Sequence, residues 1–244
     1  MSQENGEVLV SREGHCWTFT LNRPEKMNAL NANIVESLLA GIEDAHANGA
    51  SVLVFRGNGR NFSAGFDFGG FEEQSEGDLL QRFVRIETLL QAIDGSPCLT
   101  VALAHGKNFG AGVDLFASCK VRISTPDAFF RMPGLKFGLV LGTRRFGALV
   151  GTQVARAILE EARGFNAQEA EAIGFLTQTA DEAAWPELIT QANGRAAQLD
   201  AATRAHLYQV LGNQAGYDAD LAALVRSAAA PGLKDRIRAY RSAG

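Results

Sequence analysis

The sequence lacks several features that would assign it directly to a functional class. Cysteine occurs three times in 244 residues, and Cys16, Cys98 and Cys119 fit no metal-binding spacing. An odd number of cysteines is typical of a reducing compartment. No apolar run is long enough to cross a membrane, and residues 1–10 (MSQENGEVLV) contain no signal-peptide core. We therefore expect a soluble, cytoplasmic protein with no membrane association.

An excess of basic residues is also missing. Lysine and arginine number 23 against 27 aspartates and glutamates, so the formal net charge is −4. Proteins that bind nucleic acid in general are usually basic, so we expect no nucleic-acid partner. Hydrophobic residues make up 46% of the chain, which is enough for a large core. A local cluster of cations could still bind a small polyanionic ligand.

Apolar periodicity predicts alternating strands and helices up to about residue 180. Strands are expected at residues 8–11, 16–21, 51–56, 98–104, 121–124, 128–131 and 175–178. Helices are expected around residues 34–45, 79–93 and 143–163, with a glycine-rich segment at 106–112 opening another. Residues 181–244 are alanine-rich and helical, with breaks at 212–216 and 231–232. This order predicts an α/β core at residues 1–180 and a helical C-terminal region, and it fits either a layered spiral or a doubly wound sheet.

Familiar nucleotide-binding and hydrolase motifs are incomplete. Gly110 and Gly112 begin a dinucleotide fingerprint, but Leu115 replaces its third glycine. Ser63 is not in a nucleophile elbow, because Asn61 stands where that motif needs glycine. The four histidines have no metal-ligand spacing. We therefore expect neither a dinucleotide cofactor, nor a serine hydrolase, nor a metal site.

Two glycine-containing segments together resemble the signature of the enoyl-CoA hydratase/isomerase (crotonase) superfamily. Residues 61–68 read NFSAGFDF and residues 105–115 read HGKNFGAGVDL. Further matches, in the same order as in the family, occur at 21–24 (LNRP), 28–30 (NAL), 119–123 (CKVRI) and 127–130 (DAFF). The resemblance covers about residues 8–179. It implies a crotonase-like (ClpP/crotonase) α/β spiral of strand-strand-helix turns, and a homotrimer or homohexamer in which residues 181–244 take part in trimerisation.

The two segments also have the composition that enolate chemistry needs. Negative charge builds on a thioester oxygen when a proton leaves the adjacent carbon, and each fixed N–H donor lowers that barrier by about 3–4 kcal/mol. Glycine-rich turns let the backbone approach a ligand, and a helix N-terminus adds partial positive charge. The resemblance implies that the donors are the backbone N–H groups of Phe66 and Ala111. It also implies an acyl-CoA thioester substrate, with coenzyme A as part of that substrate and no separate cofactor.

The resemblance further implies where coenzyme A binds. Its adenine and phosphates would lie near residues 23–30 and 64–68, with Arg23 and Lys26 as phosphate partners. Ordinary solvated surface is the alternative for these two cations. Asp67 would brace its loop. The other expected contacts in this region are Ala29, Leu30, Ala64, Gly65, Phe68 and Gly110.

The sequence departs from the family at its acids. Hydratases of the family carry two glutamates, and the corresponding positions here are Asp114 and Gly134. Some isomerases carry an acid where this chain has Gly142. Concerted hydration needs two carboxylates on one water, whereas a double-bond shift needs one group that moves a proton. We therefore expect isomerisation or hydratase-like chemistry with Asp114 as the only evident acid/base, its pKa raised by an apolar pocket.

Two alternatives stay open. Asp114 could brace its helix, and Glu72, Glu73, Arg131 and Lys136 are lesser candidates for a replacement acid. The chain could also be a catalytically impaired homologue or subunit that binds CoA esters. The missing carboxylates favour that interpretation, and the intact oxyanion segments oppose it. The sequence does not indicate the acyl group.

Overall fold

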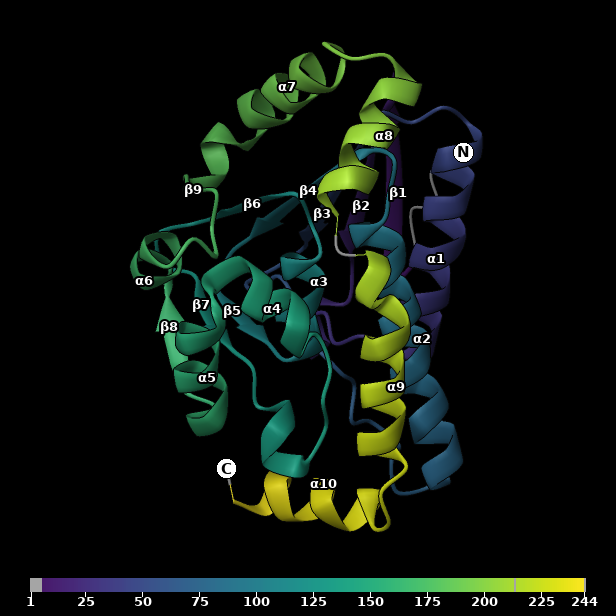
Figure 1. The fold of residues 1–244 in the computed structure, drawn as a ribbon, viewed down its shortest axis with the longest axis vertical. Coiled ribbons are helices and arrows are strands. Elements are labelled where there is room, and N and C mark those ends of the chain that lie inside the picture. The colour runs from purple at the N-terminus through teal and green to yellow at the C-terminus, as the bar shows by residue number, and fades with distance from the viewer. Residues whose placement is uncertain (1–5, 213, 244) are drawn as a thin grey trace.

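A twisted, mainly parallel sheet lies at the centre of the molecule (Figure 1). The computed structural model describes residues 6–212 and 214–243, so the predicted absence of a signal peptide falls partly on residues 1–5, outside this range. The sheet contains β1 (Val8–Glu13), β2 (Cys16–Leu21), β3 (Val52–Gly57), β4 (Leu99–Ala104), β6 (Val121–Ser124) and β9 (Gln178–Thr179), in the order β1-β2-β3-β4-β6-β9. β1 and β2 are antiparallel, and the following pairs are parallel.

A second sheet of three short strands distinguishes the fold from a doubly wound sheet. It contains β5 (Lys107–Phe109), β7 (Phe129–Arg131) and β8 (Gly164–Asn166), in the order β5-β7-β8. The chain passes from β4 in the large sheet to β5 in the small one, and later repeats that step from β6 to β7. These repeated steps build the predicted spiral.

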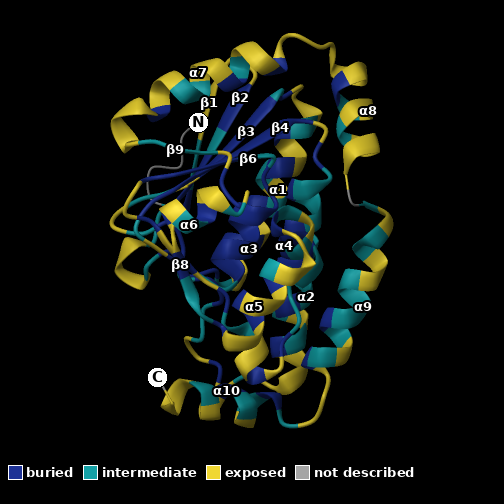
Figure 2. Ribbon diagram, turned by 60° about the vertical axis from the view of Figure 1, so that its left-hand side comes forward, coloured by how far each residue is buried: buried dark blue, intermediate teal, exposed yellow. Residues whose placement is uncertain are grey.

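Helices cover both faces of the large sheet (Figure 2). The helices of the core are α1 (Ala32–Ala47), α2 (Glu76–Asp94), α3 (Ala111–Ala117), α4 (Thr143–Val150), α5 (Thr152–Glu161) and α6 (Ala167–Ala172). The C-terminal helices are α7 (Trp185–Ala196), α8 (Ala201–Leu211), α9 (Tyr217–Ala228) and α10 (Leu233–Ser242). Single 3₁₀ turns lie at η1 (Pro24–Lys26), η2 (Gly134–Phe137), η3 (Glu182–Ala184) and η4 (Gln214–Gly216).

Alternation along β3 explains why both faces need cover. Leu53 and Phe55 join the large core beneath α1 and α2, whereas Val52 and Val54 join a smaller core with Trp185 of α7. Successive side chains of a strand point to opposite faces, so an apolar strand must be covered on both sides. The strand predicted at residues 51–56 is confirmed as β3, and α7 covers its second face.

Two predicted elements were wrong in their bounds. The helix expected at residues 143–163 is broken at Gly151, whose φ of 82° and ψ of 149° end α4 and set a new direction for α5. The second half of that helix, α5, ends at Glu161, and Gly164 begins β8. The strand expected at 175–178 is reduced to β9, because Phe175 and Leu176 are buried in the core directly after the turn at Gly174.

The C-terminal region packs on its own chain. Both predicted breaks, at residues 212–216 and 231–232, are confirmed, since α8 ends at Leu211 and α10 begins after Gly232. α9 lies along α2, where Gln91 Nε2 donates to the Tyr217 carbonyl at 3.1 Å. The end of α8 exposes Leu207, Val210 and Leu211. The role of this region in trimerisation stays a prediction.

Candidate functional site

The two segments singled out by the sequence lie against each other. The Phe109 N–H donates to the Ser63 carbonyl at 3.0 Å, and a Cβ added to Gly65 would stand 2.9 Å from the Ala111 nitrogen. Gly65 has a φ of +80°, and such a Cβ would also overlap the Phe109 carbonyl oxygen. Glycine is therefore required at position 65, both for its backbone conformation and for the approach of the two loops.

Two backbone N–H groups are left without a protein partner at this junction. The backbone of Leu30 forms hydrogen bonds with the residues on either side of Phe66. Its carbonyl accepts from the Asp67 N–H at 3.2 Å, and its N–H donates to the Gly65 carbonyl at 2.7 Å. Within the described residues, neither the Phe66 nor the Ala111 N–H donates a hydrogen bond. Ala111 is the first residue of α3, where helix N–H groups have no intrahelical acceptor. Such a pair can hold a negatively charged oxygen.

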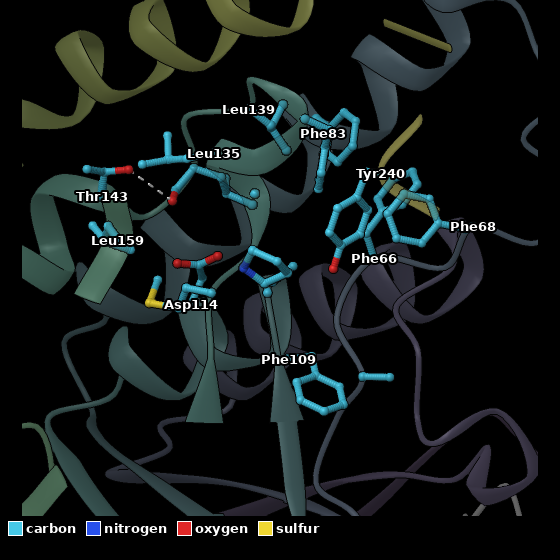
Figure 3. Close-up of a pocket in the computed structure, with 18 residues that line it drawn as sticks. Phe66, Phe68, Phe83, Phe109, Asp114, Leu135, Leu139, Thr143, Leu159 and Tyr240 are labelled. Atoms are coloured by element: carbon cyan, nitrogen blue, oxygen red, sulfur yellow. Dashed lines mark hydrogen bonds between the residues drawn. The ribbon is translucent and has the colours of Figure 1, made fainter. Parts of the chain in front are cut away.

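Both residues line an apolar cavity of about 170 Å³ (Figure 3). The loop after β3, α3, η2 and the C-terminal helix α10 all contribute to its wall. The lining side chains labelled in the figure are Phe66, Phe68, Phe83, Phe109, Asp114, Leu135, Leu139, Thr143, Leu159 and Tyr240. Among the described lining residues, only Asp114, Thr143 and Tyr240 carry polar side chains. The cavity therefore combines an apolar wall with a few polar groups, as small-molecule sites do.

Asp114 lies on this wall, three residues after Ala111. Its side chain is buried, and Oδ1 has no hydrogen-bond partner among the described residues. Burial raises the pKa of the Asp114 carboxyl well above its usual range, the charge of Arg145 opposes the rise, and the charge of Glu87 adds to it. A buried carboxyl group with a raised pKa and an unpartnered oxygen on the cavity wall can serve as a catalytic acid/base.

The raised pKa of Asp114 predicts how stability changes with pH. Above the pKa of an unfolded aspartate the folded chain still holds this proton, so unfolding releases it and rising pH favours unfolding. The wild type should lose up to about 1.4 kcal/mol of unfolding free energy per pH unit from this source, and Asp114→Asn should not. Urea unfolding at pH 5 and pH 8 checks this. Parallel pH dependence in the two proteins would contradict the burial of an ionisable Asp114.

A buried ion pair lies close enough to Asp114 to affect the pKa of its carboxyl. Arg145 of α4 donates from Nη2 to Oε1 of Glu87 on α2, and both side chains are almost inaccessible. Gln91 Nε2 also donates to Glu87 Oε1, at 2.9 Å. Arg145 Nε and Nη1 have no partner in the described part of the chain. The sequence analysis missed this pair, although Glu87 follows Phe83 by four residues on the apolar stripe of α2, which was a usable signal.

Loss of one member of this pair should destabilise the fold. Glu87→Gln removes the carboxylate that is hydrogen-bonded to the buried Arg145 and leaves only the Asp220 carboxylate, 3.9 Å away, so we expect a loss of about 3 kcal/mol in the free energy of unfolding. Glu36→Gln is a matched control, because Glu36 pairs with Arg85 at the exposed surface and should cost less than about 1 kcal/mol. Chemical denaturation measures both. Equal losses would contradict the distinction between the buried and exposed pairs.

The two glycines at the family's acid positions both lie near Asp114. Gly134 lines the cavity in η2. Gly142, with a φ of +65°, precedes α4, and a Cβ added there would overlap Asp114 Oδ1. A side chain at position 142 and the present position of Asp114 therefore exclude each other. The described lining holds one carboxylate, that of Asp114.

None of the lesser candidates for a replacement acid lines the cavity. Glu72 pairs with Arg238 at the surface, and Glu73 is exposed. Arg131 Nε donates to the Ala162 carbonyl. Lys136 Nζ donates to the Glu160 carbonyl.

Thr143 and Tyr240, which the sequence analysis missed, do line the cavity. Thr143 directly follows Gly142, the position at which some isomerases of the family carry an acid. Tyr240 gave no signal at all, because it lies in a helical region without a motif.

The two cations predicted to hold the phosphates of coenzyme A differ in how they are occupied. Arg23 already pairs with carboxylates of the chain, whereas Lys26 pairs with none of the described ones. The Arg23 guanidinium bonds to Asp67 and lies 3.3 Å from Glu7 Oε1. Asp67 also accepts from the Gly69 N–H at 2.8 Å. Burial alone would raise the pKa of Asp67, but these hydrogen bonds and the charge of Arg23 bring the pKa below its usual range. Lys26 is exposed and has no partner in the described structure, which leaves its ammonium free for a phosphate.

The remaining predicted contacts surround the same junction. Ala64, Phe68 and Gly110 line the cavity. Leu30 and Ala29 are buried beside the loop that carries Phe66. Their contact with a ligand stays a prediction.

The described residues hold no cluster that suggests a metal. No group of three or more His, Cys, Asp or Glu side chains comes together there as metal ligands could. In the same part of the chain, no helix combines the length and apolar character that crossing a membrane requires.

Comparison with known proteins identifies the family. A family model described as enoyl-CoA hydratase/isomerase matches residues 12–226. A candidate enoyl-CoA hydratase/isomerase from Bordetella parapertussis is 61% identical, with a TM-score of 0.94 over 96% of this chain and 97% of that one. The Mycobacterium bovis protein named "Probable enoyl-CoA hydratase echA6" is 37% identical over 174 residues, 69% of this chain and 70% of that protein. With its motifs, fold and cavity in agreement, the chain belongs to the enoyl-CoA hydratase/isomerase family.

Proposed function

We propose that this chain binds a short enoyl-CoA thioester, stabilises its enolate and shifts its double bond, with Asp114 moving the proton. The observation that carries the proposal is the junction of Phe66, Ala111 and Asp114 on one cavity, with two unengaged N–H donors and one buried carboxyl. The chemistry needs an anion site and one group that exchanges a proton.

The thioester oxygen would accept hydrogen bonds from the Phe66 and Ala111 N–H groups. Negative charge moves onto that oxygen when a proton leaves the carbon beside the thioester. The same happens when the proton leaves a carbon that is conjugated with the thioester through the double bond. The donors are fixed by the Leu30 contacts and by the start of α3, so they need no rearrangement as charge develops. Each donor of this kind lowers the barrier by about 3–4 kcal/mol.

Asp114 would take a proton from one carbon and return it to another. In its ionised form the carboxylate accepts the proton, the C–H electron pair passes into the enolate, and the same carboxyl group then protonates a different carbon. Burial disfavours the ionised form, which makes that form a stronger base. The cycle consumes no water and needs no second acid, in agreement with glycine at positions 134 and 142.

Hydratase-like chemistry is the second candidate. The names of the curated relatives favour it, since those from Mycobacterium bovis and Bacillus subtilis are named probable enoyl-CoA hydratases. The single carboxylate of the described lining opposes the two-acid scheme of hydration. A catalytically impaired, ester-binding homologue is the remaining alternative.

The size of the cavity indicates a small acyl group. A dry cavity of about 150 Å³ in another protein accommodates benzene, so about 170 Å³ suits an acyl chain of about six carbons or a single ring. We further propose that Lys26 contacts a phosphate of coenzyme A, which enters as part of the substrate with no other cofactor. We also propose a cytoplasmic homotrimer or homohexamer, with residues 181–244 at its subunit contacts.

A panel of short CoA esters tests the proposed function. The purified full chain is incubated with 2-enoyl-, 3-enoyl- and saturated esters of four to eight carbons, and products are followed by ultraviolet absorbance and mass. A change in absorbance without a change in mass indicates isomerisation. A gain of one water indicates hydration and would replace the proposed reaction. Binding without any turnover would identify the impaired homologue.

A further inference from the structure

Hydrogen bonds and an ion pair from several residues of the C-terminal helix α10 hold this helix in place beside the cavity. Lys234 Nζ donates to the carbonyls of Glu72 and Gln74, at 2.6 and 3.0 Å. Arg238 forms a bidentate pair with the Glu72 carboxylate, from Nε to Oε1 and from Nη2 to Oε2. These bonds join α10 to the segment between the Phe66 loop and α2. In Figure 1, α10 runs below η2 across the end of the molecule.

A second set of bonds joins α10 to η2. Arg236 Nη1 donates to the Phe137 carbonyl at 2.9 Å, and Nη2 donates to the Ser227 and Ala230 carbonyls at 3.1 and 2.9 Å. The Phe137 and Tyr240 rings pack with their centroids 5.2 Å apart. Because Phe137 also lines the cavity, these contacts fix Tyr240 relative to the cavity wall.

The Tyr240 hydroxyl is a polar group on an apolar wall and has no partner among the described residues. Figure 3 shows the ring beside those of Phe66 and Phe68, with its hydroxyl directed toward the cavity. Of the other two polar side chains, Thr143 already donates to the Leu141 carbonyl at 3.4 Å, and Asp114 serves the proposed proton transfer. Within the described residues the Tyr240 hydroxyl makes no hydrogen bond. Tyr240 is half-buried, so its hydroxyl faces a space that an acyl group could fill. Once a bound ligand excludes water, a tyrosine hydroxyl there needs a new partner, because an unmet donor costs free energy.

We propose that Tyr240 is a specificity residue whose hydroxyl bonds to an oxygen on the acyl group. The site would then select short acyl-CoA esters that carry a hydroxyl or oxo group over esters with plain hydrocarbon chains. This inference rests on the proposed function, since it takes the cavity to hold the acyl group. A hydroxyl in a water-poor site discriminates in this way because an analogue without the oxygen leaves the donor unmet.

Matched binding measurements test the inference. Calorimetry gives dissociation constants of the full chain for saturated CoA esters of six carbons, either plain or with one hydroxyl or oxo group at carbon 3, 4 or 5. For at least one oxygenated ester, the wild type should bind about tenfold more tightly than for the plain ester. Tyr240→Phe should bring that ratio, measured within the variant, close to one.

Tyr208→Phe is the matched control. Tyr208 is also half-buried, but it lies on α8 against Lys120 and does not line the cavity, so its loss of a hydroxyl should leave the ratio unchanged. Equal affinities of the wild type for all esters, or an unchanged ratio in Tyr240→Phe, would overturn the assignment of Tyr240 and leave the proposed function standing. Failure of the wild type to bind any ester would overturn both.

Discussion

Asp114→Asn is expected to lower kcat by a factor of about 10² to 10⁴ while leaving the binding of CoA esters nearly unchanged. The substitution keeps the size of the side chain and removes its ability to carry a proton. Within the described cavity lining no other carboxylate can replace it, because positions 134 and 142 are glycines. The expected pattern is therefore a loss in turnover with the dissociation constant preserved.

Asp127→Asn is the control for this change. Asp127 lies exposed in a turn before β7, so the same replacement of a carboxylate by an amide should leave turnover unchanged. Turnover is measured on the best ester from the substrate panel, and binding by calorimetry. If Asp114→Asn retained wild-type turnover, Asp114 would be a structural residue and the one-base mechanism would fail.

Ala111→Pro is expected to lower kcat by a factor of about 10² to 10³, because it removes one of the two proposed N–H donors. Proline is accepted at the first position of a helix, where its missing N–H would have no intrahelical acceptor. Gly110, with a φ of 47°, gives the preceding backbone the freedom that a proline neighbour needs. The fold should therefore survive the substitution.

Ala201→Pro places the same residue at the same helix position outside the cavity. Ala201 is the exposed first residue of α8, so this control should retain turnover and stability. Turnover and thermal unfolding are compared for both variants. A folded Ala111→Pro variant with wild-type kcat would rule out the Ala111 N–H as an oxyanion donor.

The sequence predicted the junction of the two loops because both segments carry local requirements. Gly65 must have a positive φ and lie close to Ala111, and such constraints appear in the sequence as glycines in fixed positions. The alternation of apolar residues likewise predicted β2, and the apolar run at residues 51–56 predicted β3. These patterns left a spiral and a doubly wound sheet both open, and the family match confirmed the crotonase-like fold that the resemblance implied.

The other parts of the site depend on contacts between distant segments. Tyr240 reaches the cavity because α10 crosses η2, and nothing near position 240 encodes that crossing. Arg145 and Glu87 meet only when α4 packs near α2. The break at Gly151 was predictable in principle from its glycine, but the amphipathic pattern continues on both sides and concealed it.

Deuterium exchange tests the central claim most directly, since it detects enolate formation whatever the final product. The full chain is incubated in D₂O with a short saturated CoA ester that binds, and the mass of the recovered acyl group is followed over time. We predict enzyme-dependent incorporation of deuterium at the carbon beside the thioester, strongly slowed in Asp114→Asn and in Ala111→Pro. Absence of incorporation with every ester that binds, or equal rates in the wild type and both variants, would contradict stabilisation of an enolate at this site.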